Sequence, residues 1–386
     1  LNHTWYTTLK SDLFSGNDSL FVSNIMKMYF SAINSAKNSG DWNEANELLV
    51  YIQKFQEKYG HKVIPSSYKT DLEIKYNNTQ LFNKLFIIYS LLGGCLLILL
   101  IIQIFNNYRW LSSLVIVIKY LIYIGFVSHT IGLVVRGLIS EHAPWSNAYE
   151  SIIYIAWATL LSGVLFSKKS PLTLVATCIV SSLLLMVAHL NWLDPEITNL
   201  VPVLKSYWLM IHVAIITASY GFLSLGAMLG LFVLWIMIIS TKSNMKKLES
   251  ISEELSIINE KSLIIGLFAL TIGTFLGGIW ANESWGRYWG WDPKETWALV
   301  SILVYAFILH MRFIPILQGR FIFNFASVLG IWSIIMTYFG VNYYLSGLHS
   351  YAAGDPIPIP SFVYYLIGIT FISAILAHMN YKKIYE

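Results

Sequence analysis

Charged residues are scarce in this sequence of 386 residues. They make up 12% of the chain, against 56% for hydrophobic residues, whereas a soluble domain averages about 25% charged residues. Apolar runs such as FIIYSLLGGCLLILLIIQIF reach the roughly 20 residues that span a bilayer. The composition therefore excludes a soluble globular protein and predicts an all-α polytopic membrane protein. The net charge of +4 is small and gives no reason to expect a nucleic-acid partner.

Cysteine is also rare. The two cysteines, Cys95 and Cys178, each lie within an apolar run, where packing is the expected role. The chain has no CxxC or CxxCH motif, which excludes a dithiol oxidoreductase of that type and a c-type cytochrome. It begins at Leu1 and shows no signal peptide, so we expect it to be the C-terminal part of a longer protein.

Nine stretches are long and apolar enough to cross a membrane. They lie near residues 82–106, 113–138, 151–167, 171–189, 207–240, 263–280, 298–316, 321–346 and 362–380. The stretch between the fifth and sixth spans is charged and predicts a helical connector.

The first part of the chain is polar and differs from the rest. Its apolar residues recur at helical spacing and predict two amphipathic helices, with a turn at Gly40 between them. An extended lead into the membrane is expected after Pro65. These features predict an extracytoplasmic helical segment (1–81), a linking transmembrane helix (82–106) and a membrane domain (107–386).

Lysine and arginine fall in alternate connections, and the positive-inside rule places those connections in the cytoplasm. They are Arg109, Lys168, Lys169, Lys242, Lys246, Lys247, Arg320, Lys382 and Lys383. The N-terminus and the other loops then face the outer side, with the C-terminus in the cytoplasm. Four cations break this pattern and are candidates to meet a ligand: Arg136, Lys205, Arg287 and Lys294.

The densest aromatic tract covers residues 280–297, WANESWGRYWGWDPKETW, on the predicted outer side. An interfacial aromatic belt explains two or three such residues, but not glycines between the rings or the WDPKE run. Flat aromatic faces separated by glycine favour a large planar ligand. The order Asp292, Pro293, Glu295 is also a strong start signal for a helix.

Four histidines lie within or just beyond the predicted spans, and an ionisable residue within a span is a functional candidate because its burial is costly. Histidine is a common axial ligand of haem iron. His212, about five residues into the fifth span, and His349, just past the eighth, lie near the level of the tract. They are consistent with a bis-histidine site facing the tract, or with two separate interfacial histidines.

His310 and His129 lie deeper in their spans, roughly 18 Å and 14 Å from the outer ends at about 1.5 Å per residue. One interpretation is a second, buried bis-histidine site. The other is that His129 is a packing histidine beside Ser128 and Thr130.

The run WGRYWGWDPKETW resembles the tryptophan-rich WWD signature of haem-handling proteins in cytochrome c maturation. The pattern falls on Trp285, Gly286, Trp289, Trp291, Asp292 and Glu295. HAPWSNAYES and ITNLVPVLKSYWLMIHVAIITASYGF are also similar to the CcsA (ResC-like) family of system II. The resemblance covers roughly residues 110–380.

The resemblance implies a holocytochrome c synthase of a bacterial inner (cytoplasmic) membrane, which moves haem b to the outer face. There the haem vinyl groups would join the CxxCH thiols of an apocytochrome c, with a thiol reductant system as a further partner and lipid around the helices. It implies that His212 and His349 bind the outer haem iron and that His310 belongs to a haem site within the membrane. The partner of His310 would come from a CcsB-like protein or a missing N-terminal region, with His129 as the fallback. Residues 1–106 look like the tail of such a region.

The same resemblance suggests roles around the haem. Trp285, Trp289 and Trp291 would contact the porphyrin, with Gly286 and Gly290 allowing close approach. Arg287, Lys294 and Arg136 are the cations placed to meet the propionates. Asp292 has two open roles, as a helix cap or as a catalytic group.

Two other functions remain open at this point. A b-type membrane cytochrome in electron transfer also places histidine pairs within helices, but the sequence shows no second matched pair. A haem exporter without synthase activity fits the same residues.

Overall fold

The computed structural model of the protein describes residues 12, 14–62, 64–106, 108–190, 193–198, 200, 205–348 and 359–385. Within these ranges the ordered elements are helices, and no strand occurs, as the sequence predicts. The chain divides into two compact units, Leu1–Asp71 and Leu72–Glu386.

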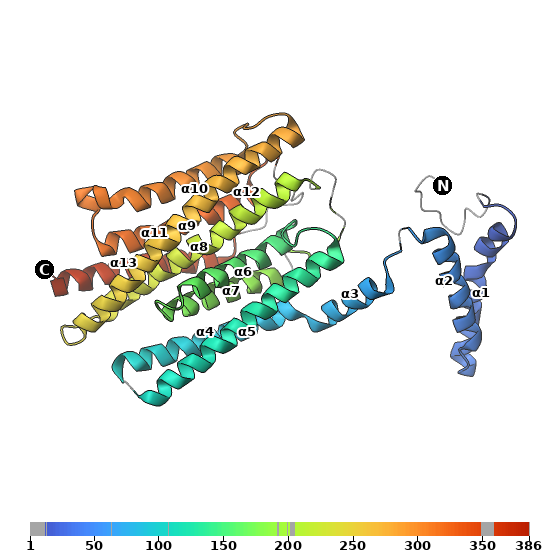
Figure 1. Ribbon diagram of the computed structural model, residues 1–386, viewed down its shortest axis with the longest axis horizontal. Helices are drawn as coiled ribbons and strands as arrows, with labels where there is room; N and C mark the ends of the chain where they lie inside the picture. The colour runs from blue at the N-terminus through green and yellow to red at the C-terminus, as the bar shows by residue number, and fades with distance from the viewer. Residues whose placement is uncertain are drawn as a thin grey trace. The chain divides into compact units, whose positions relative to one another are not determined.

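The first unit contains the two predicted amphipathic helices, α1 (Asn17–Ser39) and α2 (Asn43–Gly60) (Figure 1). They pack through a small apolar cluster of Ile25, Ala32, Ala45 and Leu48. The turn between them begins at Gly40, whose φ of 79° favours glycine and ends α1. Both helices and this turn are therefore confirmed.

The predicted extended lead into the membrane is wrong, because the chain there forms α3 (Ser67–Thr79). Its sequence, SYKTDLEIKYNNT, contains no glycine or proline, and its leucine, glutamate and lysines favour a helix. Gln80, with φ of 45°, separates it from α4 (Leu81–Phe105).

The second unit is a helical bundle. The described residues contain nine helical spans long and apolar enough to cross a membrane, as predicted. After α4 they comprise α5 (Arg109–Ser140), α6 (Ala148–Phe166), α7 (Leu172–His189), α8 (Tyr207–Ile239), α9 (Met245–Trp285), α10 (Pro293–His310), α11 (Arg320–Ile335) with its continuation, and α13 (Ser361–Tyr385). That continuation is a π-helical turn, η5 (Met336–Gly340), followed by α12 (Val341–Tyr344). Two 3₁₀ turns, η3 (Met311–Phe313) and η4 (Pro315–Leu317), connect α10 to α11.

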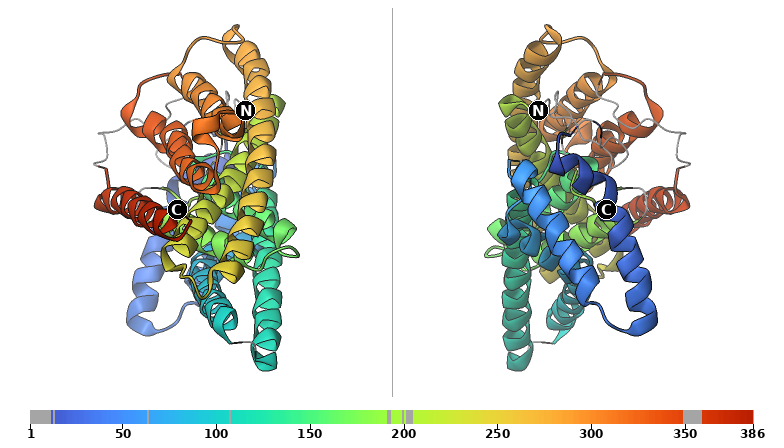
Figure 2. Two further views of the ribbon diagram at one scale, coloured as in Figure 1. Left: turned by 90° about the vertical axis from the view of Figure 1, so that its left-hand side faces the viewer. Right: turned by 90° about the vertical axis from the view of Figure 1, so that its right-hand side faces the viewer.

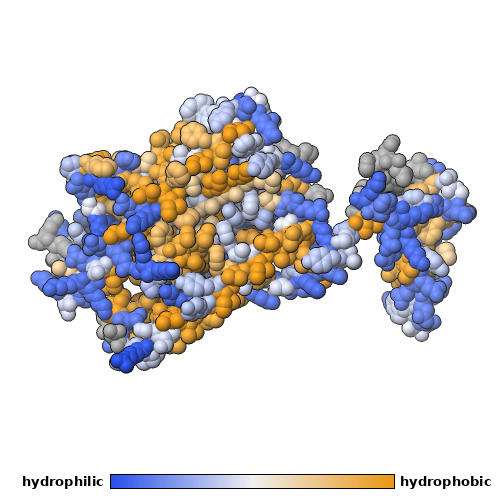
Figure 3. All heavy atoms as spheres, in the orientation of Figure 1, coloured by the Kyte–Doolittle hydropathy of each residue, from blue (hydrophilic) through white to orange (hydrophobic). Residues whose placement is uncertain are grey.

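The surface of the bundle matches a membrane protein. Hydrophobic residues cover its middle and hydrophilic residues gather towards its two ends (Figure 3). The connections rich in lysine and arginine lie at one end, and the loops that join α5 to α6 and α9 to α10 lie at the other (Figure 1). The alternation predicted from the loops is therefore present in the fold.

Helix α8 is the central element of the bundle. It packs against α6, α7, α9, α11 and α13. Viewed along the helices, α5 and α10 lie on opposite sides of the bundle (Figure 2). Because α8 contacts both α6 and α9, residues on these three helices can face a common interior space.

Helix α9 differs from the prediction in its length. The charged connector continues into the membrane span as one helix of 41 residues. Glutamate and lysine favour this continuation, and the connector carries no proline within the helix. The same helix reaches Trp285, so the first third of the tryptophan-rich tract is helical. It ends where Gly286 adopts φ of 69°.

Close packing of α8 on α6 depends on Gly221. A Cβ at this position would lie 2.6 Å from the backbone nitrogen of Thr159 and 2.7 Å from the carbonyl carbon of Ala158. Small residues allow membrane helices to approach in this way. We expect Gly221→Ala to lower the free energy of unfolding by about 1–3 kcal/mol, since backbone atoms cannot yield as a side chain can.

The matched control for this substitution is Gly94→Ala on α4, where a Cβ meets nothing within 4 Å. It should be neutral or slightly stabilising, because alanine favours a helix over glycine. Unfolding of both variants in detergent micelles tests the prediction, and equal stability of the two would refute it.

Candidate functional site

A cavity of about 520 Å³ lies at the end of the bundle where α9 passes into α10. Its volume is within the range of ligand pockets, about 300–1,000 Å³. Aromatic side chains form much of its wall, among them Trp145, Tyr220, Trp280, Tyr288, Trp289 and Tyr338. Such a wall suits a large, flat and mostly apolar ligand.

Among the described residues, His212 is the histidine on this wall. It lies in the second turn of α8 and is 6% exposed. Its Nδ1 lies 2.8 Å from the carbonyl oxygen of Trp208, so Nδ1 donates a proton and Nε2 carries the lone pair. A hydrogen bond of this kind typically orients a metal-binding imidazole. The ring stacks on Trp280, with centroids 5.3 Å apart and planes 29° apart.

Glycine on the neighbouring helix leaves room for this arrangement. A Cβ at Gly277 would lie 3.4 Å from Cδ2 of His212. A Cβ at Gly278 would overlap the ring of Tyr288, at 2.5 Å. Both glycines line the cavity. At these two positions the backbone of α9 therefore lies directly against the aromatic wall, with no side chain between them.

The structure separates the tryptophans of the tract by position. Trp289 lines the cavity, as does Trp280, which is 1% exposed. Trp285 packs edge-on against Trp280, at 4.7 Å between centroids. Trp291 is 69% exposed and has a left-handed φ of 56°. Of the three tryptophans named from the sequence, Trp289 is therefore the one on the wall.

Trp280 is one of the wall residues that sequence reasoning missed, together with Trp145, Tyr220, Tyr288 and Tyr338. The available signal for Trp280 was its place at the end of an apolar span, one turn after Gly277. The glycines of the tract also have local reasons. Gly286 ends α9 with a positive φ, and a Cβ at Gly290 would overlap the guanidinium of Arg287.

The start of α10 is a capping box, as Asp292, Pro293 and Glu295 predict. Oδ1 of Asp292 accepts from the backbone nitrogen of Lys294 at 3.0 Å, and Oε2 of Glu295 accepts from that of Asp292 at 3.1 Å. Oδ2 of Asp292 also accepts from the backbone nitrogen of Leu348 at 2.7 Å. Asp292 therefore joins α10 to the segment after α12.

Loss of this cap should lower stability. We expect Asp292→Ala to cost about 0.5–2 kcal/mol of unfolding free energy, because backbone donors at the helix start lose their acceptor. Asp292→Asn keeps a capping oxygen and should cost clearly less. Unfolding in detergent micelles compares the two, and an alanine variant as stable as the asparagine variant would contradict the capping role.

The three cations suggested for a ligand have different environments. Nη1 of Arg287 lies 3.6 Å from Oε1 of Glu295. Arg136 is paired with Glu150 at 2.9 Å. Lys294 lines the cavity, and its Nζ donates to Oδ1 of Asn342 at 2.8 Å.

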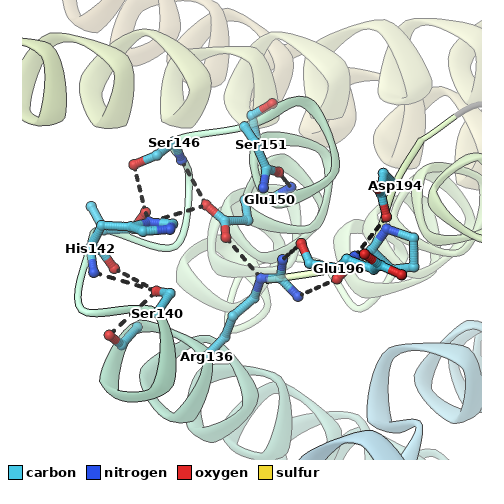
Figure 4. Close-up of polar contacts among 12 residues, drawn as sticks. Arg136, Ser140, His142, Ser146, Glu150, Ser151, Asp194 and Glu196 are labelled. Atoms are coloured by element: carbon cyan, nitrogen blue, oxygen red, sulfur yellow. Dashed lines mark hydrogen bonds and ion pairs between the residues drawn. The ribbon is translucent and has the colours of Figure 1, made fainter. Parts of the chain in front are cut away.

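Arg136 and Glu150 form a buried ion pair, at 1% and 0% exposure (Figure 4). The guanidinium also donates to the carbonyl oxygens of Pro195 at 3.0 Å and Glu196 at 3.3 Å. Oε2 of Glu150 accepts from the backbone nitrogen of Ser146 at 3.0 Å. The pair thus joins α5, α6 and two loops.

Both of these loops contribute to the cavity. Trp145 lies on the first loop and Leu193 and Asp194 on the second, and all three line the wall. The ion pair therefore holds the loops that cover the cavity. This role explains why Arg136 breaks the pattern of basic residues along the chain.

The deeper histidines are not brought together. His129 is fully buried, with Nε2 3.1 Å from the carbonyl oxygen of Ile153 and Nδ1 3.5 Å from the hydroxyl of Tyr89. This is the environment of a packing histidine. His310 is the exposed last residue of α10, with Nδ1 2.7 Å from the carbonyl oxygen of Ala306. Helices α5 and α10 lie on opposite sides of the bundle (Figure 2).

His349 and the two cysteines also have predicted roles. His349 lies outside the described residues. Cys178 is buried, as expected for packing, and its Cβ would lie 2.8 Å from a Cβ at Gly93. Cys95 is exposed on the surface of α4, so the packing role expected for it is wrong.

The fold and the site define a multi-pass membrane protein with an aromatic cavity and an oriented histidine at one end of its bundle. Residues 145–349 match the cytochrome c assembly protein family. This match covers the tryptophan-rich tract and His212, and the chain belongs to that family.

Similar proteins agree with this assignment. The chain is 49% identical over 317 residues to protein NrfI of Wolinella succinogenes. The aligned residues make up 81% of this chain and 34% of NrfI. It is 38% identical over 248 residues to the cytochrome c biogenesis protein CcsA of Prochlorococcus marinus (strain MIT 9301), covering 58% of this chain and 80% of that protein. CcsA of Synechococcus sp. (strain CC9902) is 35% identical over 263 residues, with coverage of 61% and 86%. The chain is CcsA-like and spans about a third of the length of NrfI.

Proposed function

We propose that the protein acts in cytochrome c maturation by holding haem b in the cavity and presenting it to an apocytochrome c. The observation that carries this proposal is His212, a buried imidazole on the wall of an aromatic cavity with Nδ1 bonded to a backbone carbonyl. Membership of the cytochrome c assembly family supports it, and relatives named CcsA are cytochrome c biogenesis proteins.

In this proposal haem is the substrate, and the chain supplies its position. His212 would bind the iron through Nε2, and His349 would be its second protein ligand. Trp280 and Trp289 cover the porphyrin face and exclude water from it. The donor set fits haem iron, for which histidine is a common axial ligand.

The proposed reaction is the addition of each CxxCH thiol of the apocytochrome across one haem vinyl group. The sulfur bonds the inner vinyl carbon and the hydrogen goes to the outer carbon, so the addition is redox-neutral. The cysteines must be reduced for this step, which is the role of a thiol reductant system. The protein contributes orientation, because holding reactants in place lowers the barrier.

The orientation proposed for the membrane follows the lysine and arginine loops. It places the end of the bundle that carries these loops in the cytoplasm. The cavity, at the opposite end, then lies at the outer face of a bacterial inner membrane. We further propose that residues 1–106 belong to a CcsB-like region. The remaining part of that region, or a partner protein, would supply the ligand opposite His310, whose exposed ring leaves it accessible from the side of the bundle.

Co-expression of the full-length protein with a CxxCH apocytochrome tests the function. Covalent haem on the client, detected after denaturing electrophoresis, is the expected result. A client with AxxAH in place of CxxCH is the matched control and should carry none. Haem that stays non-covalent with the CxxCH client would instead indicate an exporter or a b-type cytochrome.

A further inference from the structure

We propose that Lys294 and Asn342 form a carboxylate-binding subsite on the cavity wall, which selects a cargo with free carboxylate groups. The inference rests on the proposed function, because it identifies the part of the haem that this wall recognises. Haem b carries two propionate side chains, and these are the groups that the subsite would take.

The first argument is the ion pairing of the three cations named from the sequence, of which Lys294 lines the cavity, together with Asp194 and Glu295. Arg287 and Arg136 each have a glutamate partner. For Lys294, no carboxylate lies within 4.0 Å in the part of the chain that the structure describes, and its hydrogen bond goes to a neutral amide oxygen. An ammonium group has three donors, and an enclosed cation without an anion is unfavourable.

The nearby carboxylate of Asp292 does not fill this role. Its oxygens accept from the backbone nitrogens of Lys294 and Leu348, which is the geometry of a helix cap. The ammonium of Lys294 instead extends along the cavity wall towards α12. A carboxylate that enters with the ligand would supply the missing anion.

The second argument is the orientation of Asn342. Because an ammonium group only donates, the amide must turn Oδ1 towards Lys294, which leaves its NH₂ group directed elsewhere. Asn342 lines the cavity, and the described residues contain no acceptor within hydrogen-bond distance of this NH₂ group. A charged donor and an amide donor side by side match the two oxygens of a carboxylate.

The backbone that carries Asn342 supports a role in binding. The π-helical turn η5 directly precedes α12, and π turns within helices are frequent at functional sites. Thr337 and Tyr338 within the turn, and Asn342 and Tyr343 after it, all line the cavity. The turn therefore brings two successive segments of one span to the same wall.

The test compares haem with its dimethyl ester, in which both propionates are neutral. Full-length protein in detergent is titrated with each, and binding is followed by the Soret band. We expect wild type to bind haem about 10- to 100-fold more tightly than the ester, the range for a hydrogen bond to a charged group. Lys294→Met should lose most of this preference, while Lys294→Arg should keep most of it.

Lys119→Met is the matched control. Lys119 is a partly buried lysine on α5 that donates to the carbonyl oxygen of Ser167, outside the cavity, so its loss should leave the preference unchanged. Equal affinity of wild type for haem and ester would overturn the subsite while leaving the proposed function intact. An equal loss of both ligands in Lys294→Met would also overturn it. Failure of wild type to bind either ligand would reject the proposed function itself.

Discussion

Replacement of His212 by alanine is expected to lower the affinity of the protein for haem by more than about 100-fold. Loss of a residue that merely orients a ligand typically costs 10- to 100-fold, and loss of the ligand itself should cost more. The axial signature of the bound haem in the visible spectrum should change as well, since one imidazole is removed. Haem content and the spectrum of the purified full-length protein measure both effects.

Two comparisons make this prediction specific. His189→Ala removes an exposed histidine at the end of α7 that does not line the cavity, and it should leave the spectrum unchanged. Imidazole added to His212→Gly should restore binding, because it fills the space of the lost ring. If His212→Ala retained the haem content and spectrum of wild type, His212 would not be an axial ligand. We expect His349→Ala to disturb the same haem.

Replacement of Glu150 by alanine should destabilise the protein by about 3–5 kcal/mol. This substitution leaves the guanidinium of Arg136 buried without its carboxylate, which is the costly way to break a buried ion pair. It also removes the acceptor for the backbone of Ser146. The two loops over the cavity then lose their common anchor, so haem affinity should fall together with stability.

The control for this prediction is a partly exposed set of ion pairs at the surface. Nη1 of Arg320 lies 4.0 Å from Oε1 of Glu249, and its Nη2 lies 3.7 Å from Oε2 of Glu253, with a side chain that is 27% exposed. Arg320→Ala should therefore lower the free energy of unfolding by less than about 1 kcal/mol. The double variant Arg136→Met/Glu150→Leu should be more stable than Glu150→Ala, because it removes both charges. Unfolding in detergent micelles compares all three. A Glu150→Ala variant as stable as Arg320→Ala would disprove that the ion pair of Arg136 and Glu150 anchors the two loops.

Local patterns explain how much of this fold was predictable. The nine spans found in the described part of the chain follow from apolar length, because a helix that crosses hydrocarbon must bond its own backbone and cover it with apolar side chains. The start of α10 was predictable because a capping box involves residues three apart. The position of His212 near the start of α8 follows from the number of residues between it and the start of the fifth span.

Local patterns also explain the errors. The polarity of the lead into the membrane predicts an extended chain, although its residues after Pro65 favour a helix. The charged connector was separated from the sixth span, although nothing in it stops α9 before Gly286. In both cases a change in polarity does not mark a boundary, because a helix ends only where its backbone is interrupted or capped.

The sequence by itself determined the class of the protein, the number of its spans, the site of its aromatic tract and the histidine at the level of that tract. These depend on composition and on neighbours along one chain segment. Tertiary structure alone decided that Trp280 and Trp289 line the cavity while Trp291 is exposed. It also decided the partners of the cations: Arg136 binds Glu150, whereas Lys294 lines the wall without a carboxylate partner among the described residues. The physical reason is that the direction and the partner of a side chain depend on helices far apart in the sequence, and only their packing brings these groups together.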